Sequence, residues 1–257
     1  MIITALFSII YPLVIGRESG WSVWIFVTIT SGLLLFYLFL RYESKLESSQ
    51  KTPLLYPSLL QNRAFVSGLY IILLYNFTAG FFICYPYYLQ QFLSWSSLES
   101  GLAVLPYGIG FFLAPILSTK FSINSLTLAR TGLILLIIGT IFSAVLFLVN
   151  PTPGLFIYIG LLVAGAGHGT VMPALLKKTM TTVSIQQAGQ ASGIISTSIQ
   201  IGSVLGGAVI GSIFFTLTDV ASPPIALATA LTMIGFFQII GLGITFTYKR
   251  LINIQND

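Results

Sequence analysis

Charged side chains are scarce in this sequence. Asp, Glu, Lys and Arg make up 7% of its 257 residues, whereas soluble domains carry about 25%. Hydrophobic residues make up 56%, and the mean hydropathy is +0.96. So few charges exclude an ordinary soluble domain. The composition indicates an all-α transmembrane protein with several spans, because a chain in lipid must satisfy its backbone hydrogen bonds internally.

Cysteine and histidine each occur once, as Cys84 and His168. A single cysteine excludes an intrachain disulfide, and its apolar surroundings predict a small buried hydrophobe. No spaced cluster of His, Cys or carboxylates indicates a metal site, and we expect no cofactor, no catalytic residue and no enzymatic activity. The six acidic residues lie at the ends of apolar runs, in loops or in the tail. None is placed at mid-membrane, where a carboxylate is the default proton carrier.

Eight apolar runs follow one another along the chain. They cover roughly residues 1–15, 21–40, 64–93, 99–119, 129–149, 154–176, 190–217 and 224–248. The first is shorter than a full span, so we expect a truncated helix there. Three units are predicted: two transmembrane helices in 1–40, a cytoplasmic linker in 41–63, and a six-helix bundle in 64–257.

The basic residues indicate the orientation. Of the eleven Lys and Arg residues, only Arg17 falls outside one side of the predicted topology. By the positive-inside rule that side is cytoplasmic, and both termini lie on it. The same residues are spread between apolar runs, so we expect no nucleic-acid partner. In the linker, we expect four leucines to lie on the membrane surface as a short amphipathic turn. They are Leu54, Leu55, Leu59 and Leu60.

A stretch of small residues marks the seventh run. Gly202 and Gly206 lie four residues apart, as do Gly207 and Gly211, so each pair shares a helix face. In lipid such a strip lets another helix backbone approach closely. Static packing and a sliding contact between moving helices are both open readings.

Polar side chains inside apolar runs are the candidate site residues. Tyr75, Asn76, Gln200 and Gln238 must avoid hydrocarbon. Asn76 and Gln200 fit a substrate cavity or interhelical hydrogen bonding equally well, whereas Gln238 favours the latter. His168 stands in the run GAGHG, whose glycines predict a thinned helix and a wet pocket; a structural histidine and a cavity-lining or protonatable one are both open.

Glu99 follows Ser96 by three residues, directly before an apolar run. This spacing favours a capping box over a role in transport.

Several phrases, in this order, resemble the fourteen-helix drug:proton antiporter family of the major facilitator superfamily. They are YPLVIGRESGW, PLLYPSLLQNRAF, YLQQFLSWSSLESGLAVLPYGIG, GAGHGTVMPALL and QQAGQASGIISTSIQIGSVLGGAVIGSIF. The resemblance covers nearly the whole chain and implies that it corresponds to the family's last eight helices. The last six would form two inverted three-helix repeats. The family's loop G-x-x-x-D-x-x-G-R-K/R is not matched, and Ile199 stands where many relatives carry Arg.

The resemblance implies the C-terminal portion of a proton-driven multidrug exporter that works by alternating access in the inner (plasma) membrane. Its partners would be the lipid bilayer, small hydrophobic or cationic substrates, protons, and a separate N-terminal six-helix half or a second copy of itself. A carrier for amino acids or another small metabolite is one alternative. A non-transporting fragment or subunit that needs a partner is another.

Overall fold

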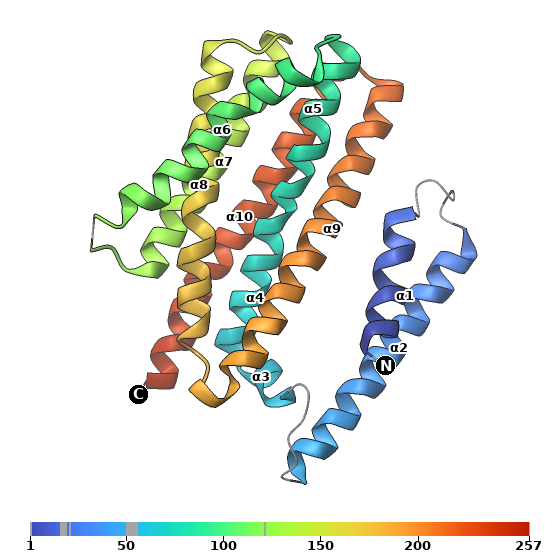
Figure 1. The fold of residues 1–257 in the computed structure, drawn as a ribbon, viewed down its shortest axis with the longest axis vertical. Helices are drawn as coiled ribbons and strands as arrows, with labels where there is room; N and C mark the ends of the chain where they lie inside the picture. The colour runs from blue at the N-terminus through green and yellow to red at the C-terminus, as the bar shows by residue number, and fades with distance from the viewer. Residues whose placement is uncertain (1, 16–19, 21, 50–55, 121, 257) are drawn as a thin grey trace.

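The computed structural model describes residues 2–15, 20, 22–49, 56–120 and 122–256, and throughout these ranges the regular structure is helical. Figure 1 shows a bundle of long helices with a separate helical hairpin beside it. The hairpin comprises α1 (Ile2–Ile15) and α2 (Val23–Ser48). The other elements are α3 (Pro57–Gln61), α4 (Arg63–Tyr75), the 3-10 helix η1 (Asn76–Gly80), α5 (Phe81–Phe92), α6 (Ser97–Ser118), α7 (Ser125–Val149), α8 (Leu155–Met180), η2 (Ile185–Gln187), α9 (Ala188–Val220) and α10 (Pro223–Asn256).

Seven helical segments in the described ranges are long and apolar enough to cross a membrane. The chain is therefore a multi-pass membrane protein, with one candidate span fewer than the eight predicted. The difference is α1, whose 14 residues extend about 21 Å at 1.5 Å per residue, short of a hydrocarbon core of about 30 Å. The division into units 1–40, 41–63 and 64–257 stays a prediction.

One span is interrupted at its middle. The span Arg63–Phe92 covers 30 residues. Within it, the 3-10 helix η1 replaces regular α-helix between α4 and α5. Such a break frees backbone carbonyls, which must be satisfied in lipid. Gln238 of α10, fully buried, donates from Nε2 to the oxygens of Leu74 at 3.1 Å and Tyr75 at 3.4 Å. The preference for interhelical hydrogen bonding at Gln238 is thus confirmed.

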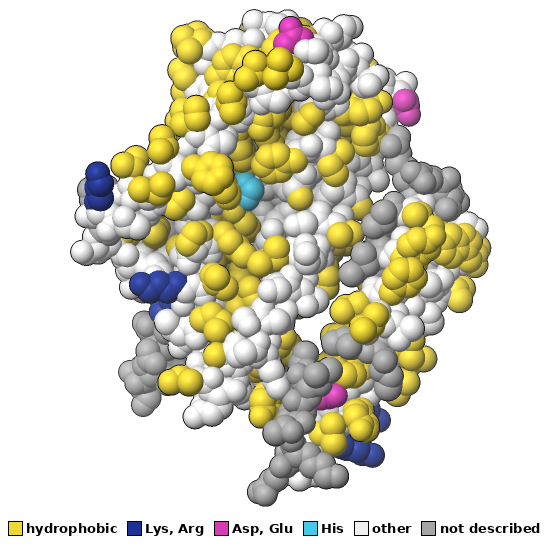
Figure 2. Space-filling view, in the orientation of Figure 1, with side chains coloured by type: hydrophobic (Ala, Val, Ile, Leu, Met, Phe, Trp, Pro, Cys, Tyr) yellow, Lys and Arg dark blue, Asp and Glu magenta, His cyan; other side chains and the backbone are white. Residues whose placement is uncertain are grey.

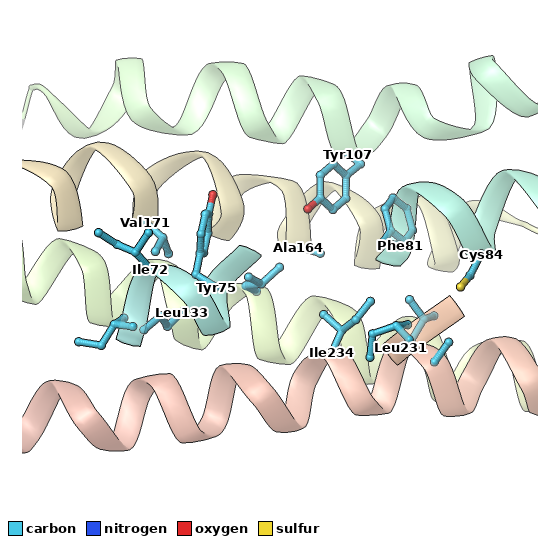
Figure 3. Close-up of a cluster of buried hydrophobic side chains, with 14 of the residues drawn as sticks. Ile72, Tyr75, Phe81, Cys84, Tyr107, Leu133, Ala164, Val171, Leu231 and Ile234 are labelled. Carbon is cyan, nitrogen blue, oxygen red and sulfur yellow. The ribbon is translucent and has the colours of Figure 1, made fainter. Parts of the chain in front are cut away.

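The bundle core is formed by side chains from α3 through α10, and Figure 3 shows part of it. Cys84 is 1% exposed and packs within this core, which confirms its prediction as a small buried hydrophobe. At the start of α6, the Ser96 amide donates to a Glu99 carboxylate oxygen at 2.7 Å, and the Glu99 amide donates to Ser96 Oγ at 3.2 Å. The predicted capping box is therefore confirmed.

The linker packs differently from the prediction. Leu59, on α3, is 2% exposed and belongs to the bundle core, so the prediction of a membrane-surface turn is wrong for this residue. Hydrogen bonds hold the segment to the start of α9, since the Tyr56 amide donates to Gln190 Oε1 at 2.8 Å. Leu60 is half-buried. Leu54 and Leu55 lie outside the described residues.

The basic residues of the bundle gather at one end. Arg63 begins α4, Lys120 follows α6, Arg130 lies near the start of α7, and Lys177 and Lys178 end α8. Consecutive spans of the bundle alternate in direction (Figure 1), so these positions fall at span ends on the same side. In Figure 2 the Lys and Arg side chains lie at the left edge and toward the bottom of the molecule. That this end faces the cytoplasm stays a prediction.

Candidate functional site

A cavity of about 410 Å³ opens on one face of the bundle, over the break in the α4–α5 span. Its walls come from α4, η1, α5, α6, α8 and α9. Aromatic side chains dominate the lining, and none of the lining residues is charged: Tyr75, Asn76, Phe82, Val104, Tyr107, Gly108, Phe111, Phe112, His168, Met172 and Ile199. The volume lies within the range of small-molecule sites, about 300–1,000 Å³.

Three predicted cavity residues, Tyr75, Asn76 and His168, line this one cavity. Gln200 does not: it is exposed, and its neighbour Ile199 lines the cavity instead. The geometry explains this, because successive helical residues are rotated by about 100°. Gln200, two positions before Gly202, points away from the face of α9 that packs on α4.

His168 is held from two sides. The Tyr75 hydroxyl donates to the His168 backbone oxygen at 2.7 Å, and the Tyr107 hydroxyl bonds the ring nitrogen Nδ1. Tyr75 comes from α4 and Tyr107 from α6, and both reach toward α8 (Figure 3). The ring centroid of His168 lies 4.7 Å from that of Tyr75 and 5.3 Å from that of Phe111. The histidine thus ties three helices together at the cavity.

The sequence predicts that the glycines flanking His168 thin α8 and open a wet pocket. The structure differs from this prediction. The glycines receive neighbouring backbones instead. A Cβ at Gly165 would lie 2.9 Å from Tyr107 Cα, and one at Gly169 would lie 2.9 Å from Phe111 Cα. One at Gly167 would lie 2.9 Å from Cα of Leu136, a residue of α7. The pocket therefore forms beside α8, between its aromatic neighbours.

Asn76 combines both roles that the sequence left open. It lines the cavity, while its Nδ2 donates to the Ile72 oxygen at 2.7 Å and its Oδ1 accepts from Ser203 Oγ at 3.3 Å. The first bond gives the Ile72 oxygen a second donor, beside the Asn76 backbone amide. The second joins η1 to α9. Asn76 therefore stabilises the break that shapes the cavity.

The glycine strip divides into two faces. Cβ atoms at Gly202 and Gly206 would lie 2.5 Å from the Leu73 oxygen and from Phe77 Cα, respectively, so this row packs directly on α4 and η1. Among the described residues, a Cβ at Gly207 would meet the tip of Ile83, and one at Gly211 would meet the ring of Phe215 on its own helix. The second row is rotated by about 100° from the first, because it is offset by one residue. The two glycine pairs therefore do not pack on the same neighbour.

Tyr107 is the site residue that sequence reasoning missed. It is 2% exposed, and aromatic residues are too common in this chain for one of them to stand out. The available signal was its position in the phrase PYGIG, beside the small Gly108 and Gly110. Gly110 packs against the backbone of α8, which indicates that this part of α6 faces the helix carrying His168.

Comparison with known proteins gives consistent matches. The model of the Major Facilitator Superfamily matches residues 1–207. The chain is 30% identical over 227 residues to a protein described as "Probable actinorhodin transporter" from Streptomyces coelicolor, covering 84% of this chain and 38% of that protein. It is 31% identical over 213 residues to the "Methylenomycin A resistance protein" of Bacillus subtilis, covering 79% of this chain and 43% of that protein.

A further relative is the "Multidrug resistance protein Stp" of Mycobacterium tuberculosis, 25% identical over 83% of this chain and 39% of that protein. The chain thus spans less than half the length of these three relatives. The family match covers most of the chain and confirms the resemblance noted in the sequence at the level of the superfamily. The chain belongs to the Major Facilitator Superfamily of membrane transporters.

Proposed function

We propose that this chain is the C-terminal part of a proton-driven multidrug exporter of the inner membrane, working by alternating access. The aromatic cavity is its share of the substrate site. The observation that carries this proposal is the uncharged, aromatic lining of a cavity that opens on one face of the bundle. Relatives described as a probable actinorhodin transporter, a methylenomycin A resistance protein and a multidrug resistance protein support the same conclusion.

The lining indicates the substrate class. Phe82, Phe111 and Phe112 offer ring faces and edges for stacking, which suits flat hydrophobic or aromatic compounds, including cations held by cation–π contacts. An amino acid carrier would need partners for an ammonium and a carboxylate. None of the lining residues supplies such a charge, so we favour drug-like substrates over amino acids.

The cavity's opening supports a partner bundle. His168 lines a cavity that opens on a flank of the bundle, where hydrocarbon would leave a polar ring atom unsatisfied. A second bundle facing this flank would complete the cavity, and a separate N-terminal six-helix half fits that role better than a second copy. The basic end of the bundle would face the cytoplasm. The partner would supply the proton-carrying carboxylate.

Phe112 provides the test. It lines the cavity and is 69% exposed, so Phe112→Ala should leave the fold intact. Lost stacking of about 0.5–1.5 kcal/mol should weaken binding of Nile red, an uncharged flat dye, by roughly 2- to 12-fold. Binding is measured with the chain in lipid nanodiscs, against protein-free nanodiscs.

The matched control is Phe156→Ala. Phe156 is 66% exposed on α8 and lies outside the cavity lining, so its truncation should leave the dye affinity unchanged. Equal affinities for Phe112→Ala and the unmodified chain would show that the dye does not bind in this cavity.

A further inference from the structure

The single histidine presents its two ring nitrogens to different surroundings. Nδ1 meets the Tyr107 hydroxyl, which comes from a neighbouring helix and is enclosed, since Tyr107 is 2% exposed. Nε2 forms no hydrogen bond with any residue that the structure describes. The chemistry of the His168 ring therefore depends on how the proton is shared between Nδ1 and Tyr107.

The direction of that hydrogen bond follows from the tyrosine. A phenol carries one proton, and a buried donor without an acceptor is costly. Within the described ranges, Nδ1 is the sole partner of the Tyr107 hydroxyl. If Nδ1 carried the proton and donated, the Tyr107 proton would have no acceptor. Tyr107 therefore donates to Nδ1, and the neutral imidazole carries its hydrogen on Nε2.

The Nε2 atom reaches the cavity. Among the described residues, the enclosed side-chain atoms that lack a partner belong to Tyr85, Ser100, Thr179 and Gln238, and Nε2 is not one of them. With no protein partner and without full enclosure, Nε2 must border open space, and the open space at His168 is the cavity. Figure 2 shows the histidine at the surface of this face, among hydrophobic side chains.

The neighbouring polar groups are already engaged. The Tyr75 and Tyr107 hydroxyls both donate to His168, and the Asn76 amide nitrogen donates to the Ile72 oxygen. The Nε2–H group is then a hydrogen-bond donor without a protein acceptor, set among aromatic rings. A ligand that offers no acceptor would leave this donor unsatisfied, which disfavours its binding.

We infer that His168 presents an Nε2–H donor to the cavity, that Tyr107 fixes this tautomer, and that the cavity selects aromatic ligands bearing a carbonyl-type acceptor. The inference deepens the proposed function and rests on it for the ligand. In this arrangement His168 is a specificity-determining residue and Tyr107 is a positioning residue.

The tautomer can be measured without a ligand. Because the chain has one histidine, labelling with [15N]histidine gives two ring-nitrogen signals from the full chain in nanodiscs. We expect Nε2 to show the shift and one-bond proton coupling of an N–H group, and Nδ1 the shift of a hydrogen-bond acceptor. Tyr107→Phe, which keeps the ring, should yield a mixture of the two tautomers. A proton on Nδ1 in the unmodified chain would overturn the inference.

Ligand selection is tested with 9-fluorenone and fluorene, flat molecules that differ by one carbonyl oxygen. We measure the ratio of their affinities for the full chain in nanodiscs. His168→Phe should reduce the preference for fluorenone roughly fivefold, the value of about one hydrogen bond. Tyr107→Phe should reduce it less, because part of the population keeps Nε2–H. A preference that is unchanged in both variants would overturn the selection.

The two experiments separate the possible failures. If neither compound binds the unmodified chain, the cavity is not a ligand site, and both the selection and the proposed function fail. The NMR tautomer then still decides whether Tyr107 orients His168. If both compounds bind and the preference does not depend on His168, only the inference fails and the proposed function stands.

Discussion

Gly206→Ala tests the closest helix contact at the cavity. Gly206 of α9 lies against η1, the segment that interrupts the α4–α5 span. An added Cβ would stand 2.5 Å from Phe77 Cα and 2.9 Å from the Phe77 oxygen. Both atoms are backbone and cannot rotate away, so α9 and η1 must separate.

The size of the effect follows from that displacement. Ordinary van der Waals contact for a Cβ begins at 3.4 Å, so the helices must move apart by about 1 Å. Overpacking of this kind costs about 1–3 kcal/mol. Replacing glycine by alanine also favours a helix by about 0.8–1.0 kcal/mol, which would hide part of the loss.

Gly193→Ala removes that ambiguity. Gly193 lies on the same helix, and a Cβ there would have no neighbour within 4 Å among the residues that the structure describes. The helix-propensity gain is shared by both variants, so the difference between them isolates the contact at about 1–3 kcal/mol. We expect Gly206→Ala to melt several degrees below Gly193→Ala when both are heated in the same detergent. Equal melting temperatures would refute close packing of α9 on η1.

Two further predictions concern the helix break and the topology. Gln238→Leu should lower the melting temperature, because the Nε2 hydrogen bonds to the Leu74 and Tyr75 oxygens would be lost, at about 0.5–1.5 kcal/mol for a hydrogen bond. The Tyr75 oxygen would keep the Thr78 hydroxyl as a donor. Gln200→Leu, at an exposed position, should change the melting temperature little, and equal losses would contradict the assigned role. In a Cys84→Ala chain, cysteines introduced at Ser49 and Thr152 should react with a membrane-impermeant reagent from opposite sides, and labelling of both from outside would refute the orientation.

The spans were predictable because lipid imposes a simple selection on length and hydropathy. The interruption at η1 was not, because it depends on a distant residue. Gln238 lies 164 positions from Leu74 in the chain. No local pattern around Leu74 indicates that a distant side chain donates a hydrogen bond to its oxygen. Likewise, Leu59 could be recognised as apolar, but its burial depends on where the bundle leaves room for α3.

The residue types of the site were predictable from the sequence. The helix face on which each side chain lies was less predictable. Buried polar groups inside apolar runs led to Tyr75, Asn76 and His168, because hydrocarbon tolerates such groups only where they have a partner or a cavity. The prediction for Gln200 was wrong because it did not consider which face of α9 packs on α4. Gly202 and Gly206 share a face, and Gln200 lies about 200° away from Gly202 around the helix. Applied to the sequence, that angle would have excluded it.

Tyr107 could not be identified from the sequence as the partner of His168. Their pairing arises where α6 and α8 approach at Gly165 and Gly169, whose missing side chains admit the backbone of α6. The sequence shows the small residues but not which helix they receive. Contacts between helices distant in the chain therefore decide the chemistry of the cavity.

Transport by the purified chain alone tests the central claim most directly. The account holds that this chain provides one wall of an exporter's cavity and that a second bundle is needed for alternating access. The chain is reconstituted in proteoliposomes loaded with Nile red, a proton gradient is imposed, and dye movement is compared with protein-free vesicles. We predict dye binding without gradient-dependent movement of the dye. Gradient-dependent transport by this chain alone would contradict the account.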